Sequence, residues 1–135
     1  MNGFVILDTS VFINHLRTGC HEQRIRSLTG FVRTSAVVLA ELWLGSTKPA
    51  ERAFVMQLEK NHPVLAPTER NWVALRQILD RIRLDKPFLP HRAHDLFFDV
   101  LIALTASSHG ARLITSGAAD FELIRQHCHF RHEVW

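Results

Sequence analysis

Short apolar runs alternate with longer stretches of helical periodicity along the whole chain. Each short run ends in polar or turn-forming residues, which is typical of a buried strand. The longer stretches repeat apolar residues at helical spacing, and several begin at Ser, Thr or Pro. We predict strands over residues 4–7, 31–34, 64–66, 112–115 and 130–135. We predict helices over residues 11–17, 22–28, 36–44, 49–60, 68–84, 95–109 and 118–127.

This alternation predicts an α/β fold with a central parallel sheet of about five strands and helices on both of its faces. The chain has no internal repeat, low-complexity segment or linker, so we expect a single domain over residues 1–135. In open sheets of this kind, functional sites lie beyond the carboxyl ends of the strands. Asp8 follows the first strand and Ser116 to Asp120 follow the fourth, so both segments should lie on one rim.

Polar residues at the predicted helix starts indicate caps, because their side chains can accept bonds from free backbone N–H groups. Thr9 or Ser10 should cap the first helix, and Thr34-Ser35 the apolar helix that follows the second strand. Two tryptophans, Trp43 and Trp72, lie on apolar helix faces, where they should form core or dimer contacts.

Three acidic residues occupy positions where a charge is costly. Asp8 ends an apolar run, Glu41 lies inside the apolar helix 36–44, and Asp99 lies inside the apolar segment 96–104. A buried carboxylate without a partner loses hydration worth several kcal/mol. Neither apolar segment contains a Lys or Arg. A divalent cation shared by the acids would offset the cost for all of them.

Carboxylates are also the ligands that Mg²⁺ and Mn²⁺ prefer. Two such ions about 4 Å apart can activate a water and stabilise the leaving oxygen of a phosphodiester. Taken singly, Asp8 and Asp120 could be only helix caps, and Glu41 a paired surface residue. Asp95 shares a helical face with Asp99 and is better explained as an N-cap than as a ligand. The order and common rim of the acids favour a metal site.

Four segments carry a resemblance to a known family: 5–11, 35–42, 99–103 and 113–121. In their order and spacing, over essentially the whole chain, the sequence resembles PIN-domain proteins, and among them the VapC-type toxins of bacterial toxin–antitoxin pairs. The resemblance implies a PIN-like three-layer sandwich.

The same resemblance implies an Mg²⁺- or Mn²⁺-dependent endoribonuclease. Because the sequence offers four carboxylates and no nucleotide-binding loop, we expect no organic cofactor. It also implies a homodimer, a small antitoxin that blocks the active site, and RNA substrates, often structured ones such as tRNA. By motif position, the catalytic and metal-site acids are Asp8, Glu41, Asp99 and Asp120, with Thr9, Ser10 and Thr115 as supporting polar residues. The chain departs from the family at Gly117, where Asn or Asp is common, so the second metal site would lack a ligand there.

Composition narrows the setting. The 135 residues carry a net charge of +3, which permits nucleic-acid binding without requiring it. No apolar run reaches the roughly 18 residues of a membrane span, and the first residues lack the basic region of a signal peptide. The two cysteines cannot form a disulfide framework. We therefore expect a cytoplasmic protein without a membrane anchor.

Other interpretations stay open at this point. The ending with His127, Cys128, His129 and His132 invites a zinc site, but the predicted strand would spread these residues over both of its faces. His91, Arg92 and His94 could meet phosphate or be solvated loop residues. Four arginines could form a basic rim for RNA or be only scattered surface charges: Arg17, Arg24, Arg26 and Arg33.

Two other classes of function compete with the nuclease. One is a non-catalytic RNA-binding or scaffold module that kept the PIN fold. The other is a response-regulator-like phosphoacceptor, which would need a Lys on a later strand. The fourth predicted strand, residues 112–115, contains no Lys, so this class fits poorly.

Overall fold

The computed structural model describes residues 3–28, 30–87 and 92–135. Strands and helices alternate along these residues, as predicted. The strands are β1 (Val5–Leu7), β2 (Val32–Ser35), β3 (Val64–Leu65), β4 (Arg112–Thr115) and β5 (His132–Val134). The helices are α1 (Thr9–Thr18), α2 (Glu22–Ser27), α3 (Ala36–Gly45), α4 (Pro49–Asn61), α5 (Glu69–Asp85), α6 (Ala93–Ser108) and α7 (Ala118–Ile124).

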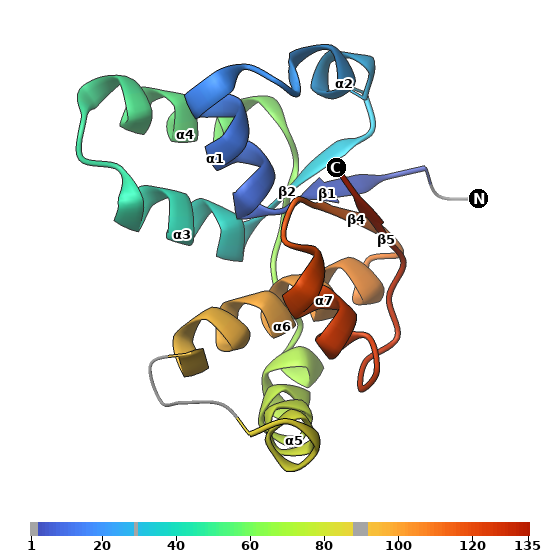
Figure 1. The fold of residues 1–135 in the computed structure, drawn as a ribbon. Coiled ribbons are helices and arrows are strands. Elements are labelled where there is room, and N and C mark those ends of the chain that lie inside the picture. The colour runs from blue at the N-terminus through green and yellow to red at the C-terminus, as the bar shows by residue number, and fades with distance from the viewer. Residues whose placement is uncertain (1–2, 29, 88–91) are drawn as a thin grey trace.

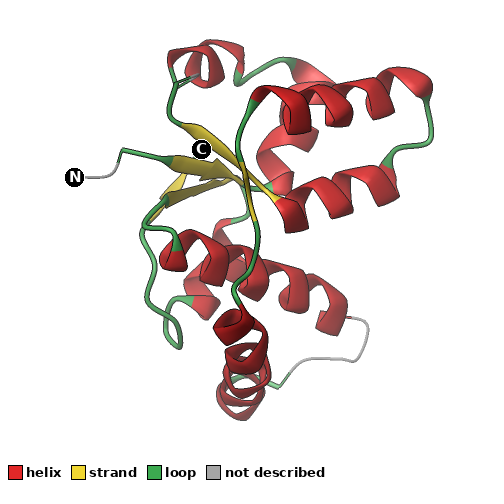
Figure 2. Cartoon of the chain, turned by 180° about the vertical axis from the view of Figure 1, so that it is seen from behind, coloured by secondary structure: helices red, strands yellow, loops and turns green. Residues whose placement is uncertain are grey.

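The strands form one parallel sheet in the order β3-β2-β1-β4-β5, which confirms the predicted sheet. Figures 1 and 2 show α1 to α4 on one side of the sheet and α5 to α7 on the other, which makes the predicted three layers. Because helices cover both faces, the central strand β1 is buried at every residue. This explains why the strands appear in the sequence as unbroken apolar runs.

Helix α6 contributes a long stretch of the core, with Val100 to Ala106 all buried. Helix α5 presents Leu75, Ile78 and Ile82 to the same core. The two tryptophans do not share this burial, since Trp72 is 52% exposed and Trp43 is 41% exposed. The expectation that they lie in the core is therefore wrong; the alternative, a dimer contact, stays a prediction.

Of the predicted pair Thr34-Ser35, it is Ser35 that caps α3, because its hydroxyl accepts from the backbone N–H groups of Val37 and Val38 at 3.1 and 3.4 Å. The predicted cap of α1 is wrong. That helix already begins at Thr9, with Asp8 at the N-cap position. The hydroxyls of Thr9 and Ser10 do not act as caps, because they bond the carboxylates of Glu41 and Asp8.

The start of α6 also differs from the prediction. The helix begins at Ala93 with Arg92 at its N-cap position, so Asp95 lies in the first turn and is not the cap. Its carboxylate instead pairs with the Arg92 side chain at 3.4 Å. The neighbouring His91, to which we assigned a possible phosphate contact, lies outside the described residues.

Helix α7 ends at Ile124, earlier than predicted, because the chain turns there through short backbone bonds from Gln126 to Leu123 and from His127 to Ile124.

No helix within 3–28, 30–87 or 92–135 is both long and apolar enough to cross a membrane.

Candidate functional site

Asp8 is fixed at the point where β1 leaves the sheet. Its side chain is 4% exposed, and its backbone N–H donates to the carbonyl of Ile114 on β4 at 2.8 Å. Its carboxylate oxygen Oδ2 accepts from the Ser10 hydroxyl at 2.7 Å and from the Thr115 hydroxyl at 2.9 Å. The ends of β1 and β4 therefore lie together on one rim, as the sequence predicted.

The two hydroxyls also hold the loop that follows β4. Ser10 Oγ accepts from the backbone N–H of Ser116 at 3.0 Å, and Thr115 Oγ1 accepts from that of Gly117 at 2.9 Å. Gly117 has a φ of −97°, and a Cβ added there would meet Thr115 Oγ1 at 3.6 Å, an ordinary contact. The backbone at residue 117 would therefore accept a side chain, so its conformation does not explain why glycine stands there.

Glu41 reaches the same rim from α3. The Thr9 hydroxyl donates to Glu41 Oε1 at 2.8 Å. Burial raises the pKa of the Glu41 carboxyl, the Thr9 hydrogen bond opposes that rise, and the charges of Asp8 and Asp95 add to it. All three predicted supporting residues therefore contact one of the predicted acids: Thr9, Ser10 and Thr115.

Asp99 shows the largest electrostatic disturbance. Burial in α6, and after it the charges of the neighbouring acids, together raise the pKa of its carboxyl from 3.8 to about 8. These neighbours are, in decreasing order of effect, Asp8, Glu41, Asp120 and Asp95. The predicted acids thus share one electrostatic neighbourhood, and Asp95 belongs to it although sequence reasoning assigned it only a capping role.

Asp120 differs from the other acids because it has a cationic partner. Its Oδ1 lies 2.6 Å from Nη2 of Arg92, whose Nη1 lies 3.4 Å from Oδ2 of Asp95. Sequence reasoning grouped Arg92 with the preceding loop and missed this contact. The only signal was the position of Arg92 at the start of the helix that carries Asp99, which gives no information about its pairing with α7.

The chemistry of these side chains fits a hard divalent cation. Carboxylate and hydroxyl oxygens are the ligands that Mg²⁺ and Mn²⁺ prefer, and a cation would relieve the mutual repulsion around Asp99. In the described part of the chain, however, no three Asp, Glu, His or Cys side chains are already arranged to hold a metal ion. The convergence of Asp8, Glu41, Asp99 and Asp120 on one ion stays a prediction.

The zinc interpretation of the C-terminal histidines gains no support. His127 Nε2 lies 2.8 Å from the carboxylate of Asp85, and His132 Nε2 lies 3.4 Å from that of Glu122. These two histidines therefore face different acidic partners on different helices.

Three of the four arginines of the predicted basic rim are engaged elsewhere. Arg24 stacks on Trp135, Arg26 pairs with Glu22, and Arg33 lies over the Phe4 ring. Arg17 lines a cavity of about 310 Å³ that Thr9 and Glu41 also line. Of the four, it is Arg17 that the structure places beside a predicted site acid.

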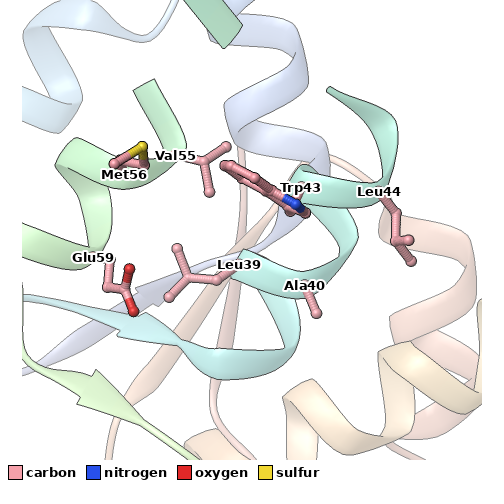
Figure 3. Close-up of a pocket in the computed structure, with 7 residues that line it drawn as sticks. All are labelled: Leu39, Ala40, Trp43, Leu44, Val55, Met56 and Glu59. Atoms are coloured by element: carbon pink, nitrogen blue, oxygen red, sulfur yellow. The ribbon is translucent and has the colours of Figure 1, made fainter. Parts of the chain in front are cut away.

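The other face of α3 borders an apolar groove of about 580 Å³ against α4 (Figure 3). Leu44 is 77% exposed and Met56 is 59% exposed, which is unusual for large apolar side chains. The Arg52 guanidinium lies 4.8 Å from the centre of the Trp43 ring. The groove is lined by Leu39, Ala40, Trp43, Leu44, Val55, Met56 and Glu59.

Comparison with known proteins agrees with the fold. The sequence model of the PIN domain matches residues 5–125. The chain is similar to DNA-bound VapBC from Salmonella typhimurium, with 25% identity, a TM-score of 0.76 and 98% of each chain covered. It shares its fold with VapBC-1 from nontypeable Haemophilus influenzae (21% identity, TM-score 0.72, 98% of each chain). The same holds for VapBC-5 from Mycobacterium tuberculosis (23%, 0.61, 99% of this chain and 98% of that one). No match was found among curated proteins.

Proposed function

The chain belongs to the PIN-domain family, and from that premise we propose that it is a metal-dependent endoribonuclease that hydrolyses RNA phosphodiester bonds with Mg²⁺ or Mn²⁺. The observation that carries the proposal is the environment of Asp99. Its partly buried carboxyl has a pKa raised to about 8, and the neighbouring charges that shift it are all negative. Strongly perturbed acids gathered on the rim of an α/β sheet are typical of a functional site.

In this proposal the cation is held by Asp8, Glu41, Asp99 and Asp120, and it supplies charge stabilisation for the phosphodiester during hydrolysis. The chain's own contacts prepare the ligands. Both hydroxyl bonds to Asp8 fall on Oδ2, so Oδ1 would be the oxygen available to hold a cation. Thr9 similarly orients Glu41 through Oε1. These short bonds fix the carboxylates before the cation arrives, which lowers the entropic cost of binding it.

We also propose that the protein is the toxin of a VapBC-type toxin–antitoxin pair, that it forms a homodimer, and that a small antitoxin inhibits it. Support comes from the likeness to VapBC complexes and from the exposed apolar groove beside α3. Exposed apolar surface bordered by polar residues is typical of a protein-binding site. The free cysteines, Cys20 and Cys128, fit a cytoplasmic protein.

A second candidate is a non-catalytic PIN-fold module that binds RNA or acts as a scaffold. Two observations favour it: residue 117 offers no side-chain ligand, and Asp120 is paired with Arg92. The endoribonuclease would cleave RNA in the presence of metal, whereas the non-catalytic module would bind RNA without cleaving it.

The test is an RNA cleavage assay with metal-stripped protein, total tRNA and a structureless RNA, in Mg²⁺, in Mn²⁺ and in excess chelator. Asp8→Asn is the matched control, because an amide oxygen can still accept the bonds from Ser10 and Thr115. We expect cleavage by the parent protein with metal and no cleavage in chelator or by the variant. RNA binding without cleavage under every condition would support the non-catalytic module.

A further inference from the structure

One arginine joins two acids that belong to different helices. Arg92 stands at the start of α6 and reaches Asp95 one turn further along that helix and Asp120 on α7. The bond to Asp120 is the shorter, at 2.6 Å against 3.4 Å. Both acids are among those that raise the pKa of Asp99, so the guanidinium stands beside the acidic cluster.

The geometry and charges of the Arg92–Asp120 ion pair favour a stable contact. The pair joins a planar guanidinium, which suits carboxylate geometry, to the Asp120 carboxylate. Charge-assisted bonds of this length are among the stronger hydrogen bonds in proteins. The Arg92 and Asp120 side chains are 40% and 31% exposed, so solvent weakens the pair without abolishing it.

From these contacts we infer that Arg92 is a positioning residue that competes with the divalent cation for the carboxylate of Asp120. The inference rests on the proposed function. Asp120 Oδ1 cannot accept the Arg92 bond and serve as an undisturbed metal ligand at the same time. A guanidinium beside the cluster also repels a second positive charge, and repulsion between nearby charges is substantial where water is partly excluded.

The contact with Asp95 would hold the Arg92 guanidinium if Asp120 released it. When Asp120 turns to the cation, the guanidinium keeps its bond to Asp95, so it stays at the edge of the cluster. The ion pair therefore sets the metal concentration at which the site fills. This makes Arg92 a determinant of metal affinity and not a catalytic residue.

The test measures Mn²⁺ binding to metal-stripped protein by isothermal titration, without RNA. Arg92→Gln removes the competing charge, and we expect Mn²⁺ to bind roughly three- to tenfold more tightly, as expected for loss of one partly screened charge. Arg125→Gln is the matched control, since it removes the same charge from a partly exposed ion pair with Glu122 on the C-terminal side of α7. The control should leave Mn²⁺ affinity unchanged.

A double-mutant cycle isolates the contact itself. In an Asp120→Asn background, Arg92→Gln should change Mn²⁺ affinity less than in the parent protein, because the contested ligand is gone. Arg92→Lys keeps the charge, and we expect Mn²⁺ affinity between those of the parent and the Gln variant. Thermal unfolding of each metal-free variant checks that the fold is intact.

Each outcome decides the inference. Tighter binding by Arg92→Gln, including binding by this variant when the parent shows none, supports competition. Equal or weaker binding than the parent overturns it and leaves the proposed function standing, because the parent still binds metal. No Mn²⁺ binding by the parent, Arg92→Gln or Arg125→Gln overturns both the inference and the proposed metal site.

Discussion

Helix α3 separates two regions of opposite chemistry. On one side, Glu41 joins the acidic rim, defined here as Asp8, Glu41, Asp95, Asp99 and Asp120. On the other, Leu39, Trp43 and Leu44 border the apolar groove against α4 (Figure 3). The rim is partly buried and tied by short hydroxyl bonds, whereas the groove is open and its largest side chains are exposed.

Both regions are unfavourable in the isolated chain, for different reasons. The rim gathers like charges where water is partly excluded, which costs free energy unless protons or a cation neutralise them. The groove leaves apolar surface in contact with water. In the proposed function a cation would neutralise the rim, and an apolar segment of the partner protein would cover the groove.

The largest effect on activity is expected at Glu41, which belongs to the rim alone. Glu41→Gln keeps an oxygen that can accept the Thr9 bond but removes the charge. We expect RNA cleavage to fall by at least about 100-fold, since even changes around a metal's ligands cost 10- to 100-fold. Partner binding at the groove and metal-free stability should be retained. A marked fall in the unfolding temperature of the metal-free variant would show that Glu41 is structural.

The reverse change tests the groove. Leu44→Ser should weaken binding of the inhibitory partner by roughly tenfold or more, as loss of a well-buried interface side chain does, and leave RNA cleavage unchanged. Leu84→Ser is the matched control, because Leu84 is 83% exposed and lies on α5, outside the groove. Binding measured by co-purification and surface plasmon resonance checks both variants. Equal binding by the two would remove the groove from the interface.

A third prediction uses the electrostatics of the rim. The folded Asp99 carboxyl has a pKa near 8 against 3.8 in the unfolded chain, so the folded protein holds a proton that unfolding releases. The stability of the metal-free protein should therefore fall as pH rises from about 4 to 8 and change little through this group above that range. Glu41 adds a shift in the same direction.

Asp99→Asn should flatten this pH dependence, which unfolding by denaturant at several pH values in excess chelator can measure. Parallel curves for the variant and the parent would mean that Asp99 is not the carboxyl that retains the proton.

The smallest effect is expected at Asp95, which shares a helical face with Asp99. Asp95→Asn should cost at most about 1 kcal/mol of stability, as for changes in the first turn of a helix, and retain most of the cleavage activity. Asp99→Asn should retain the fold and lose the activity. Activities in the reverse order would move the metal site toward the start of α6.

The sequence predicted the alternation of strands and helices, the parallel sheet and the cap at residues 34–35, because these depend on local patterns of polarity. It also predicted that Asp8 and residues 116–120 lie on one rim, since parallel strands end at the same edge. It failed for the start of α1, where Thr9 and Ser10 resemble caps but Thr9 bonds the distant Glu41 carboxylate and Ser10 bonds the adjacent Asp8 carboxylate.

The pairing of Arg92 with Asp120 and the exposure of Trp43 could not be predicted from local sequence. Arg92 and Asp120 lie on separate helices, so their contact depends on how α6 packs against α7. An apolar helix face looks the same in sequence whether the core or a partner covers it. Such contacts arise from the tertiary arrangement and carry no local signal.

The most direct test of the central claim is metal rescue of RNA cleavage. Metal-stripped protein is titrated with Mn²⁺ while cleavage of a labelled RNA is followed, with Asp99→Asn as the matched variant. We expect no RNA cleavage before the metal is added. Added Mn²⁺ should restore cleavage to a saturating level in the parent protein and should not restore it in Asp99→Asn. Full cleavage by the stripped protein in excess chelator would contradict it.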